Sequence, residues 1–257
     1  MNKKTVETFT VVKKESFNHS IFRVILKSPK PLLEVRAGQF ANLDIPDEKD
    51  VFLRRPFSFL DADYSNNTLS FLIKVAGKGS RALAEMDEGE KVSVVYPLGK
   101  GFSMPTSRET ILCIGGGSGI APMLQLVKNS GLPLQNIHVL LGFRSLEEAV
   151  LLDEYQPFAS FHYTTNDGSL GEKGLVTEHS IFRDLHKFDR IYTCGPLPMM
   201  KAIASVARRE NIFCEVSLEN LMACGFGVCL CCIEPTVKGN QRVCSDGPVF
   251  NINDLKW

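Results

Sequence analysis

Short apolar runs separated by turn residues fill the first hundred residues. Most of these runs are rich in Val, Ile and Phe and end at Gly, Pro, Asn or Asp, which favour turns. They are SIFRVILKS (20–28), QFANLDI (39–45), FSFLDADY (57–64), TLSFLIKVA (68–76) and EKVSVVYPL (90–98). Apolar and polar positions alternate only in part, as expected for strands that close on themselves. The pattern predicts an antiparallel β-barrel domain over residues 1–102.

From residue 103 the pattern changes to apolar strands that alternate with helices. The expected strands lie in TILCIGGGSG (110–119), NIHVLLGF (136–143), FHYTT (161–165), DRIYTCG (189–195) and FCEVSLE (213–219). The expected helices are APMLQLVKNSG (121–131), LEEAVLLDEYQ (146–156) and PLPMMKAIASVARREN (196–211). Strands and helices at this interval form a parallel sheet covered on both faces. We therefore predict an α/β dinucleotide-binding domain over residues 103–219.

The remaining segment, residues 220–257, is too short to hold a hydrophobic core unaided. It carries five of the eight cysteines: Cys224, Cys229, Cys231, Cys232 and Cys244. A metal centre would take the place of the missing core. We expect thiols to stay reduced in a cytoplasmic protein, where clustered cysteines are metal ligands more often than disulfides.

Charge and hydropathy exclude several classes of function. Lys plus Arg and Asp plus Glu each number 29, and this balance gives no basic face for nucleic acid. The longest apolar runs have the length of strands, so we expect no membrane span. The opening MNKKTVETFTVV lacks the apolar region of a secretory signal, and we expect a cytoplasmic protein.

Two strand ends run into glycine turns that open helices. GGGSGIAP (115–122) could bring backbone N–H groups and a helix N-terminus to a pyrophosphate. It departs from G-x-G-x-x-G at Ile120 and lacks a P-loop lysine, so a tight turn without ligand is the alternative. TCGPLPMM (193–200) is a second turn of this kind, at the strand end where open α/β sheets bind ligands. By itself, Cys194 is an ordinary small buried residue.

The barrel region carries two polar motifs. LRRPFSF (53–59) places two arginines before an aromatic ring and a hydroxyl, which suits a phosphate and a flat ring system. A solvated arginine pair on a barrel strand is the alternative, and the pattern alone slightly favours it. VAGKGSRAL (75–83) adds a glycine turn and a helix start near Ser80, which is a second phosphate seat.

The cysteine spacing is the most specific signal in the chain. Cys224, Cys229 and Cys232 form C-x4-C-x2-C, and Cys244 follows, as in plant-type 2Fe–2S proteins. Zinc is the chief alternative, although its sites usually show two separated cysteine or histidine pairs. Cys231 adjoins Cys232 and is expected to be a spare thiol beside the cluster, open to oxidation.

Taken together, these motifs resemble the flavin-containing ferredoxin reductase superfamily. Its recurring motifs occur in order as AGQF (37–40), RPFS (55–58), GKGS (77–80), GGGSGIAP (115–122) and CGPLPM (194–199). A narrower resemblance, to the electron-transfer subunits of dihydroorotate dehydrogenase B, comes from TNDGSLGEKGLVTE (165–178), SLENLMACGFGVCLCC (217–232) and VCSDGPVF (243–250). That family usually has glycine at the position of Cys231.

The resemblance implies three cofactor sites. FAD would be held by Arg55, Pro56, Phe57, Ser58, Leu72, Ile73, Lys74, Gly79 and Ser80. NAD would be held by Gly115, Gly116, Gly117, Gly119, Cys194, Gly195 and Pro196. The 2Fe–2S ligands would be Cys224, Cys229, Cys232 and Cys244. Ser58, near the flavin N5, and Cys194, near the nicotinamide, would be the catalytic neighbours.

The resemblance also implies a partner. An FMN-containing subunit would oxidise dihydroorotate, and electrons would pass through the cluster and FAD to NAD+ in pyrimidine (UMP) biosynthesis, within a heterotetramer of two copies of each chain. The alternatives are the small subunit of a ferredoxin:NADP or sulfhydrogenase-type oxidoreductase, and a zinc-bearing interaction module. Arg144 is the residue that would suit NADP, while the resemblance favours NAD. Phe226 and Val228, beside the cluster, are the expected docking face.

Overall fold

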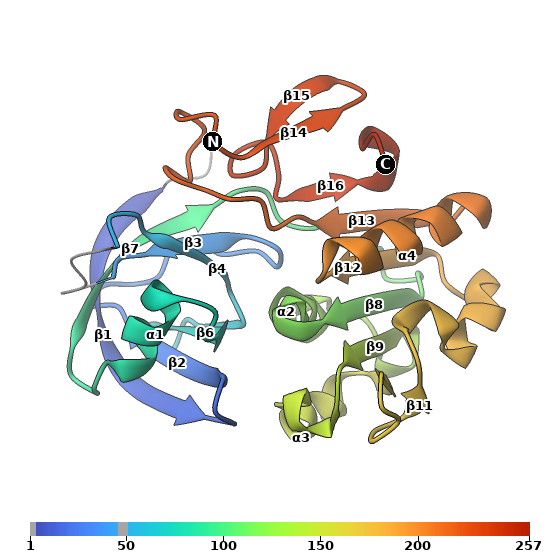
Figure 1. Ribbon diagram of the computed structural model, residues 1–257, viewed down its shortest axis with the longest axis horizontal. Coiled ribbons are helices and arrows are strands. Elements are labelled where there is room, and N and C mark those ends of the chain that lie inside the picture. The colour runs from blue at the N-terminus through green and yellow to red at the C-terminus, as the bar shows by residue number, and fades with distance from the viewer. Residues whose placement is uncertain (1–3, 46–50) are drawn as a thin grey trace.

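Two seven-stranded sheets form the body of the molecule, and a small C-terminal segment lies across both (Figure 1). The computed structural model describes residues 4–45 and 51–257. The first three residues of the segment in which we expected no secretory signal lie outside this part. No helix within the described ranges is long and apolar enough to cross a bilayer.

The N-terminal sheet is antiparallel throughout, in the order β4-β3-β7-β1-β2-β6-β5. Its strands are β1 (Thr5–Ser16), β2 (Ile21–Lys27), β3 (Phe40–Leu43), β4 (Arg55–Ser58), β5 (Asp61–Asp63), β6 (Thr68–Lys74) and β7 (Lys91–Leu98), with helix α1 (Lys78–Glu85) before β7. The sheet curls so that β4 also contacts β6, and Phe9 and Tyr96 meet edge to face inside it, with ring centroids 5.4 Å apart. The predicted antiparallel barrel is confirmed as an open barrel.

The second sheet has the order β11-β10-β9-β8-β12-β13-β16, and all its pairs are parallel except β13 with β16. Its strands are β8 (Ile111–Gly116), β9 (Ile137–Phe143), β10 (Ser160–Thr165), β11 (Glu172–Lys173), β12 (Arg190–Cys194), β13 (Phe213–Ser217) and β16 (Val249–Asn251). Alternation on β8 divides the core: Cys113 packs with α2 (Ile120–Asn129), and Leu112 packs with α4 (Leu197–Arg209). The predicted doubly covered parallel sheet is confirmed.

The helix expected over residues 146–156 is not continuous. The chain forms a 3-10 turn, η3 (Leu146–Glu148), and then the short α3 (Leu152–Tyr155). Leu151 between them has a φ of 66°, which is incompatible with a right-handed helix. The remaining 3-10 segments are η1 (Gly117–Gly119), η2 (Leu134–Asn136), η4 (Gln156–Phe158), η5 (Val176–Glu178), η6 (Ser180–Lys187) and η7 (Ile252–Asp254).

The C-terminal segment is attached to the second sheet rather than folded apart from it. Its hairpin, β14 (Ile233–Thr236) with β15 (Gly239–Arg242), is followed by β16, which pairs antiparallel with β13 and sets Val249 opposite Ser217. The loop between β13 and β14 carries four of the cysteines and passes over β3 and β7 of the barrel (Figure 1). Cys232 and Cys244 are buried with the residues that pack under α4.

Candidate functional site

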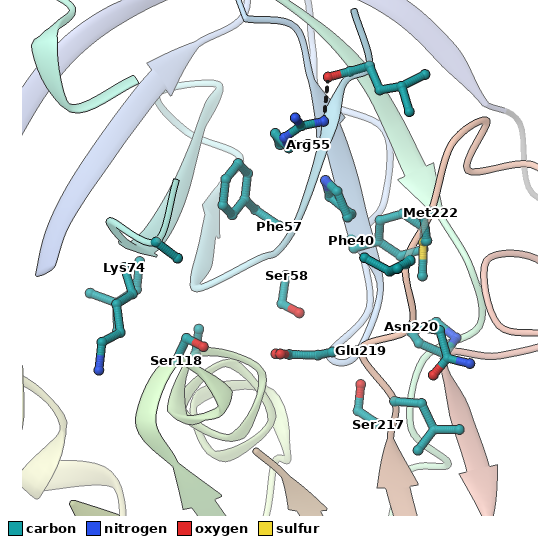
Figure 2. Close-up of a pocket in the computed structure, with 18 of the residues that line it drawn as sticks. Phe40, Arg55, Phe57, Ser58, Lys74, Ser118, Ser217, Glu219, Asn220 and Met222 are labelled. Atoms are coloured by element: carbon teal, nitrogen blue, oxygen red, sulfur yellow. Dashed lines mark hydrogen bonds between the residues drawn. The ribbon is translucent and has the colours of Figure 1, made fainter. Parts of the chain in front are cut away.

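A cavity of about 730 Å³ opens where the barrel, the parallel sheet and the C-terminal segment meet. Figure 2 shows Ser58, Ser118 and Glu219 directed toward one another from different parts of the chain. The residues that line it are Phe40, Leu53, Arg55, Pro56, Phe57, Ser58, Leu72, Lys74, Ala76, Ser118, Ala121, Ser217, Leu218, Glu219, Asn220, Leu221, Met222, Cys231 and Pro248. Residues far apart in the sequence therefore share one space.

Strand β4 contributes the whole RPFS motif to this cavity. β4 pairs with β3, so that Phe57 lies opposite Ala41 and Ser58 opposite Phe40. The two arginines before it have different roles. Arg54 donates to the Ser93 carbonyl oxygen at 2.6 Å and to its hydroxyl at 3.0 Å, whereas Arg55 lines the cavity. The solvated arginine pair is therefore not what forms.

Alternation along β6 divides its predicted residues. Leu72 and Lys74 line the cavity, while the Ile73 side chain points the other way and is fully buried in the barrel core. Gly79 and Ser80 lie in the first turn of α1, outside the cavity lining. A Cβ at Gly79 would approach Arg55 Nε at 3.0 Å, and Ser80 Oγ accepts from the Gly77 N–H at 3.1 Å. Gly79 therefore leaves room for the Arg55 side chain, and Ser80 holds the turn that opens α1.

The two glycine turns pack against each other. A Cβ at Gly119 would overlap the Cys194 carbonyl oxygen, and one at Gly116 would approach Met199 Sδ at 2.7 Å. A Cβ at Gly115 would come within 3.0 Å of Ile120 Cα. Only Gly117, with φ +57° and open space at its Cβ position, faces outward. Three of the four glycines therefore allow close packing, and Gly117 with Ser118 presents the free edge of the turn.

The second turn buries the residue we expected beside the nicotinamide. Cys194 is fully buried at the end of β12, level with Gly115 of β8, and is not among the residues lining the cavity. Burial raises the pKa of this thiol well above its usual value. Gly195, with φ +148°, and Pro196 follow and lead into α4. Gly195 and Pro196 therefore shape the turn beside the Gly116 backbone.

Glu219 is the acidic group that sequence analysis did not single out. Its carboxylate points into the centre of the cavity, near Ser58 and Ser118 (Figure 2). The side chain is exposed because it faces the open cavity, yet protein surrounds the carboxylate closely enough that desolvation raises its pKa. No hydrogen bond or ion pair is formed by this carboxylate within the described ranges. A single acid in a loop has no spacing signal that would reveal it.

The four expected cluster ligands lie in two contacting pairs. The Cys244 N–H donates to Cys232 Sγ at 3.3 Å, and Cys224 interacts with Cys229. Gly225 and Gly227 have φ of +79° and +88°, the left-handed region that favours glycine, and the Phe226 N–H points at Cys224 Sγ at 3.5 Å. Backbone donors directed at sulfur are what an anionic iron–sulfur centre requires.

The cysteine pKa values follow this arrangement. Burial raises the pKa of Cys224, but the backbone N–H groups of Cys229, Phe226 and Val228 outweigh it and bring the pKa to about 6. Burial and the neighbouring Cys232 raise the pKa of Cys244 to about 12. No group of three or more His, Cys, Asp or Glu side chains is drawn close enough to hold a metal ion in the described part of the chain. The four cysteines and the backbone N–H groups directed at them fit an iron–sulfur cluster, and in this structure the four sulfurs lie in two separate pairs.

Cys231 belongs to neither of these pairs. It is exposed and lines the cavity together with Arg55 and Ser58. The preceding Leu230 has a φ of 60°, and this left-handed residue lies between Cys229 and Cys231. Cys231, which we did not expect to bind iron, is therefore the cysteine of this loop that lines the cavity.

Arg144, the residue that would suit a 2′-phosphate, is exposed after β9. Its backbone N–H donates to Glu148 Oε2 at 3.3 Å, and Lys74 Nζ donates to Glu148 Oε1 at 2.8 Å. These contacts lower the pKa of Glu148, although its burial opposes them. The Glu148 carboxylate beside Arg144 would repel the 2′-phosphate of NADP at this position.

Comparison with known families supports each part of this site. One family model, an oxidoreductase FAD-binding domain, matches residues 8–102, and another, an oxidoreductase NAD-binding domain, matches residues 113–205. A third, the iron–sulfur cluster binding domain of dihydroorotate dehydrogenase B, matches residues 219–256. The fold and site therefore define an FAD- and NAD-linked oxidoreductase with an iron–sulfur centre, and these matches favour iron over zinc.

Relatives define the family more narrowly. The chain is 35% identical over 228 residues to the electron transfer subunit of dihydroorotate dehydrogenase B (NAD(+)) from Fusobacterium nucleatum, covering 85% of this chain and 86% of that one. It is 37% identical to the same subunit from Caldanaerobacter subterraneus, covering 87% and 86%. The chain belongs to the family of dihydroorotate dehydrogenase B electron transfer subunits. A solved NADH-dependent reduced ferredoxin-NADP oxidoreductase is similar in structure, with TM-score 0.86 and 28% identity over 97% of this chain and 90% of that one.

Proposed function

We propose that this chain is the subunit that carries electrons from a partner dihydroorotate dehydrogenase to NAD+. The partner is an FMN-containing catalytic chain, two copies of each form the complex, and the pathway is cytoplasmic synthesis of UMP. A nicotinamide exchanges two electrons at once and an iron–sulfur cluster carries one, and a flavin between them converts one exchange into the other. This chain's own task is therefore to place and tune these groups.

The cavity adjoins the cysteine loop (residues 221–232), and this supports the proposal most strongly. Cys231 lines the same cavity as Arg55 and Ser58, and Cys229 and Cys232 flank it in the loop. A cluster held by that loop and a flavin held by β4 would share a wall. The matched FAD-, NAD- and iron–sulfur-binding regions account for all three parts of the arrangement.

We assign the residues of the chain to three regions. Residues 1–102 hold FAD, residues 103–219 hold NAD and residues 220–257 hold the cluster. FAD rests on Arg55, Pro56, Phe57 and Ser58, with Leu72 and Lys74 beside them; Gly79 leaves room for Arg55, and Ser80 holds the turn before α1. Gly117 and Ser118 offer the free edge of the NAD turn. The cluster ligands are Cys224, Cys229, Cys232 and Cys244.

Glu219 completes the proton balance of the site. Reduction of NAD+ to NADH takes two electrons and one proton, and electrons that arrive through iron bring no proton with them. The raised pKa of Glu219 keeps this carboxyl protonated to a higher pH than usual, inside the cavity and near Ser58. We assign Glu219 as the group that holds this proton, with the Ser58 hydroxyl as its neighbour.

The division of labour is tested with the purified chain and with its complex. An absorption spectrum of the chain should show flavin and iron–sulfur bands, and the chain alone should oxidise NADH with an artificial acceptor. Reduction of NAD+ by dihydroorotate should require the partner. Turnover of dihydroorotate by the isolated chain would contradict the proposal.

One alternative retains support from a solved structure. The ferredoxin-NADP oxidoreductase that aligns over 97% of this chain would share the fold and differ in its partner. The higher identity to dihydroorotate dehydrogenase B subunits favours the first proposal. Affinity capture of this chain from its own cells decides between them: an FMN-containing dihydroorotate dehydrogenase should co-purify, and a large ferredoxin-linked subunit in its place would support the alternative.

A further inference from the structure

One buried amide joins the barrel to the cysteine loop. Asn42 lies on β3 with 1% of its surface exposed, and its Nδ2 donates to the Cys224 carbonyl oxygen at 3.3 Å. A Cβ at Gly225 would overlap the same Nδ2, so the amide packs directly against the loop backbone. Within the described ranges, this is the only side-chain hydrogen bond from residues 4–102 to the loop 221–232. The contact fixes where Cys224 lies relative to the barrel.

The same strand leads to the cavity. β3 pairs with β4, and Asn42 lies opposite Pro56, between the positions that pair with Arg55 and Phe57. One hydrogen bond and one strand pairing therefore separate the backbone of Cys224 from the strand that lines the cavity. A displacement of Asn42 would move the loop and β4 relative to each other.

The second polar atom of this amide is not satisfied. Asn42 Oδ1 is buried and has no hydrogen-bond partner within the described ranges. A buried acceptor without a partner reduces stability, and a leucine of similar size would avoid that cost. The fold itself therefore gains little from an amide at this position. The contribution of the Asn42 amide is instead the hydrogen bond that its Nδ2 donates to the loop.

We propose that Asn42 is a positioning residue that holds the Cys224 backbone in register with the flavin-binding strand β4. This inference rests on the proposed function, which makes Cys224 an iron ligand. Removal of a residue that hydrogen-bonds to a metal ligand, without binding the metal itself, typically lowers metal affinity or activity by about 10- to 100-fold. An effect of that size is expected at the cluster, with FAD retained.

The test compares two variants with a matched control in the complex reconstituted with FAD, iron and sulfide. Asn42→Leu and Asn42→Asp both remove the N–H donor, and Asp keeps the size and polarity. Gln39→Leu is the control, because this buried amide bonds Gly99 and Arg36 but no residue of the loop. The measurements are iron release to a chelator, the midpoint potential and electron paramagnetic resonance spectrum of the cluster, bound FAD and the thermal midpoint.

Both Asn42 variants should release iron about 10- to 100-fold faster, with a shifted potential and an altered spectrum, while their FAD content stays at the wild-type level. Gln39→Leu should keep the wild-type cluster properties even where its thermal midpoint falls. Asn42 variants with wild-type iron release and spectrum would overturn the inference. Equal iron loss from Gln39→Leu would also overturn it, because a general loosening of the barrel would then explain the effect.

Hydrogen exchange on the iron-free chain separates this inference from the proposed function. The backbone N–H groups of residues 224–229 should exchange faster in Asn42→Leu than in the wild type or Gln39→Leu, whether or not the wild type takes up iron. A wild-type chain that stays colourless after reconstitution would overturn the proposed function. Unchanged exchange in Asn42→Leu would overturn the positioning role itself.

Discussion

The glycine turns and the cysteine loop both bend the chain sharply, but they are held in opposite ways. The turns at 115–119 and 194–196 follow paired parallel strands, and an added Cβ at most of their glycines would meet a neighbour. The cysteine loop, 221–232, has no helix or strand and exposes Phe226, Val228 and Leu230. Packing alone therefore defines the turns, whereas the loop depends on a few hydrogen bonds and on the group its sulfurs hold.

Removal of one ligand thiol should abolish cluster binding by the loop. Cys224→Ser replaces a thiolate ligand, so the variant should lose the iron–sulfur absorption, and its partner-dependent NAD+ reduction should fall by more than about 100-fold. FAD should remain, because β4 lies in the barrel and is built without the loop. Iron analysis and the visible spectrum check this, with NADH oxidation by an artificial acceptor as the control that should persist.

The turns should respond through stability instead. Gly119→Ala forces a Cβ against the Cys194 carbonyl oxygen, a backbone atom that cannot easily move, and should lower the free energy of unfolding by about 3 kcal/mol. Gly117→Ala is the matched variant, because its Cβ has open space and only its φ of +57° opposes it, at a cost of about 1 kcal/mol. Urea unfolding gives both values. Equal losses would mean that packing does not define the turn.

A substitution at Glu219 tests the role of the cavity that lies between the glycine turns and the cysteine loop. Glu219→Gln keeps the shape but carries no transferable proton, and NAD+ reduction should fall by about 100-fold. In the wild type this rate should decline as the pH rises through the raised pKa of Glu219, and the variant should lose that limb of its profile. Rates measured from pH 5 to 9 check this. An identical profile in the variant would remove Glu219 from the mechanism.

The same substitution has a defined effect on stability. Because burial raises the pKa of Glu219 above its ordinary 4.5, the folded chain binds more protons than the unfolded chain in the window between the two values, so stability falls as the pH rises through it. Glu219→Gln cannot ionise. It should therefore be more stable than the wild type at neutral pH, and the difference should disappear below pH 4.5. Urea unfolding at pH 4 and pH 7 measures this.

The smallest effect is expected at the spare thiol. Cys231→Gly should keep its iron and its spectrum, because Cys231 is exposed toward the cavity and is not one of the two contacting sulfur pairs. Alkylation by iodoacetamide should label one cysteine fewer in this variant. Loss of the cluster would instead make Cys231 a ligand and would change the assignment of the loop.

The fold could be predicted where hydrophobic periodicity was strong and local. The parallel strands followed from their apolar runs. The longest barrel strand, β1 (Thr5–Ser16), was not predicted, because only Phe9 and Val11 of its twelve residues are buried and most of the others are Thr or charged residues. The prediction of one helix over residues 146–156 was wrong at Leu151, because the pattern of apolar residues does not reveal its left-handed backbone conformation.

The site was predicted where residue type and spacing together specify chemistry. RPFS and the cysteine spacing are such signals, and residues of β4 and of the loop line the same cavity. Glu219 and Asn42 carry no such signal, because each acts alone and the residues near it are distant in the sequence, as Cys224 is from Asn42. Only the tertiary structure brings these groups to their neighbours.

The pairing of β13 with β16 gives the C-terminal segment the character of an insert. Ser217 and Val249 lie side by side, so the chain leaves the sheet and returns to it at almost the same point. Such an excursion can be shortened to a tight hairpin without cutting the sheet, because its two ends are already joined there. A chain spliced in this way should keep β4 and the glycine turns, but it should lose Glu219 together with all four expected iron ligands, so the proposed electron route and proton carrier share one removable segment.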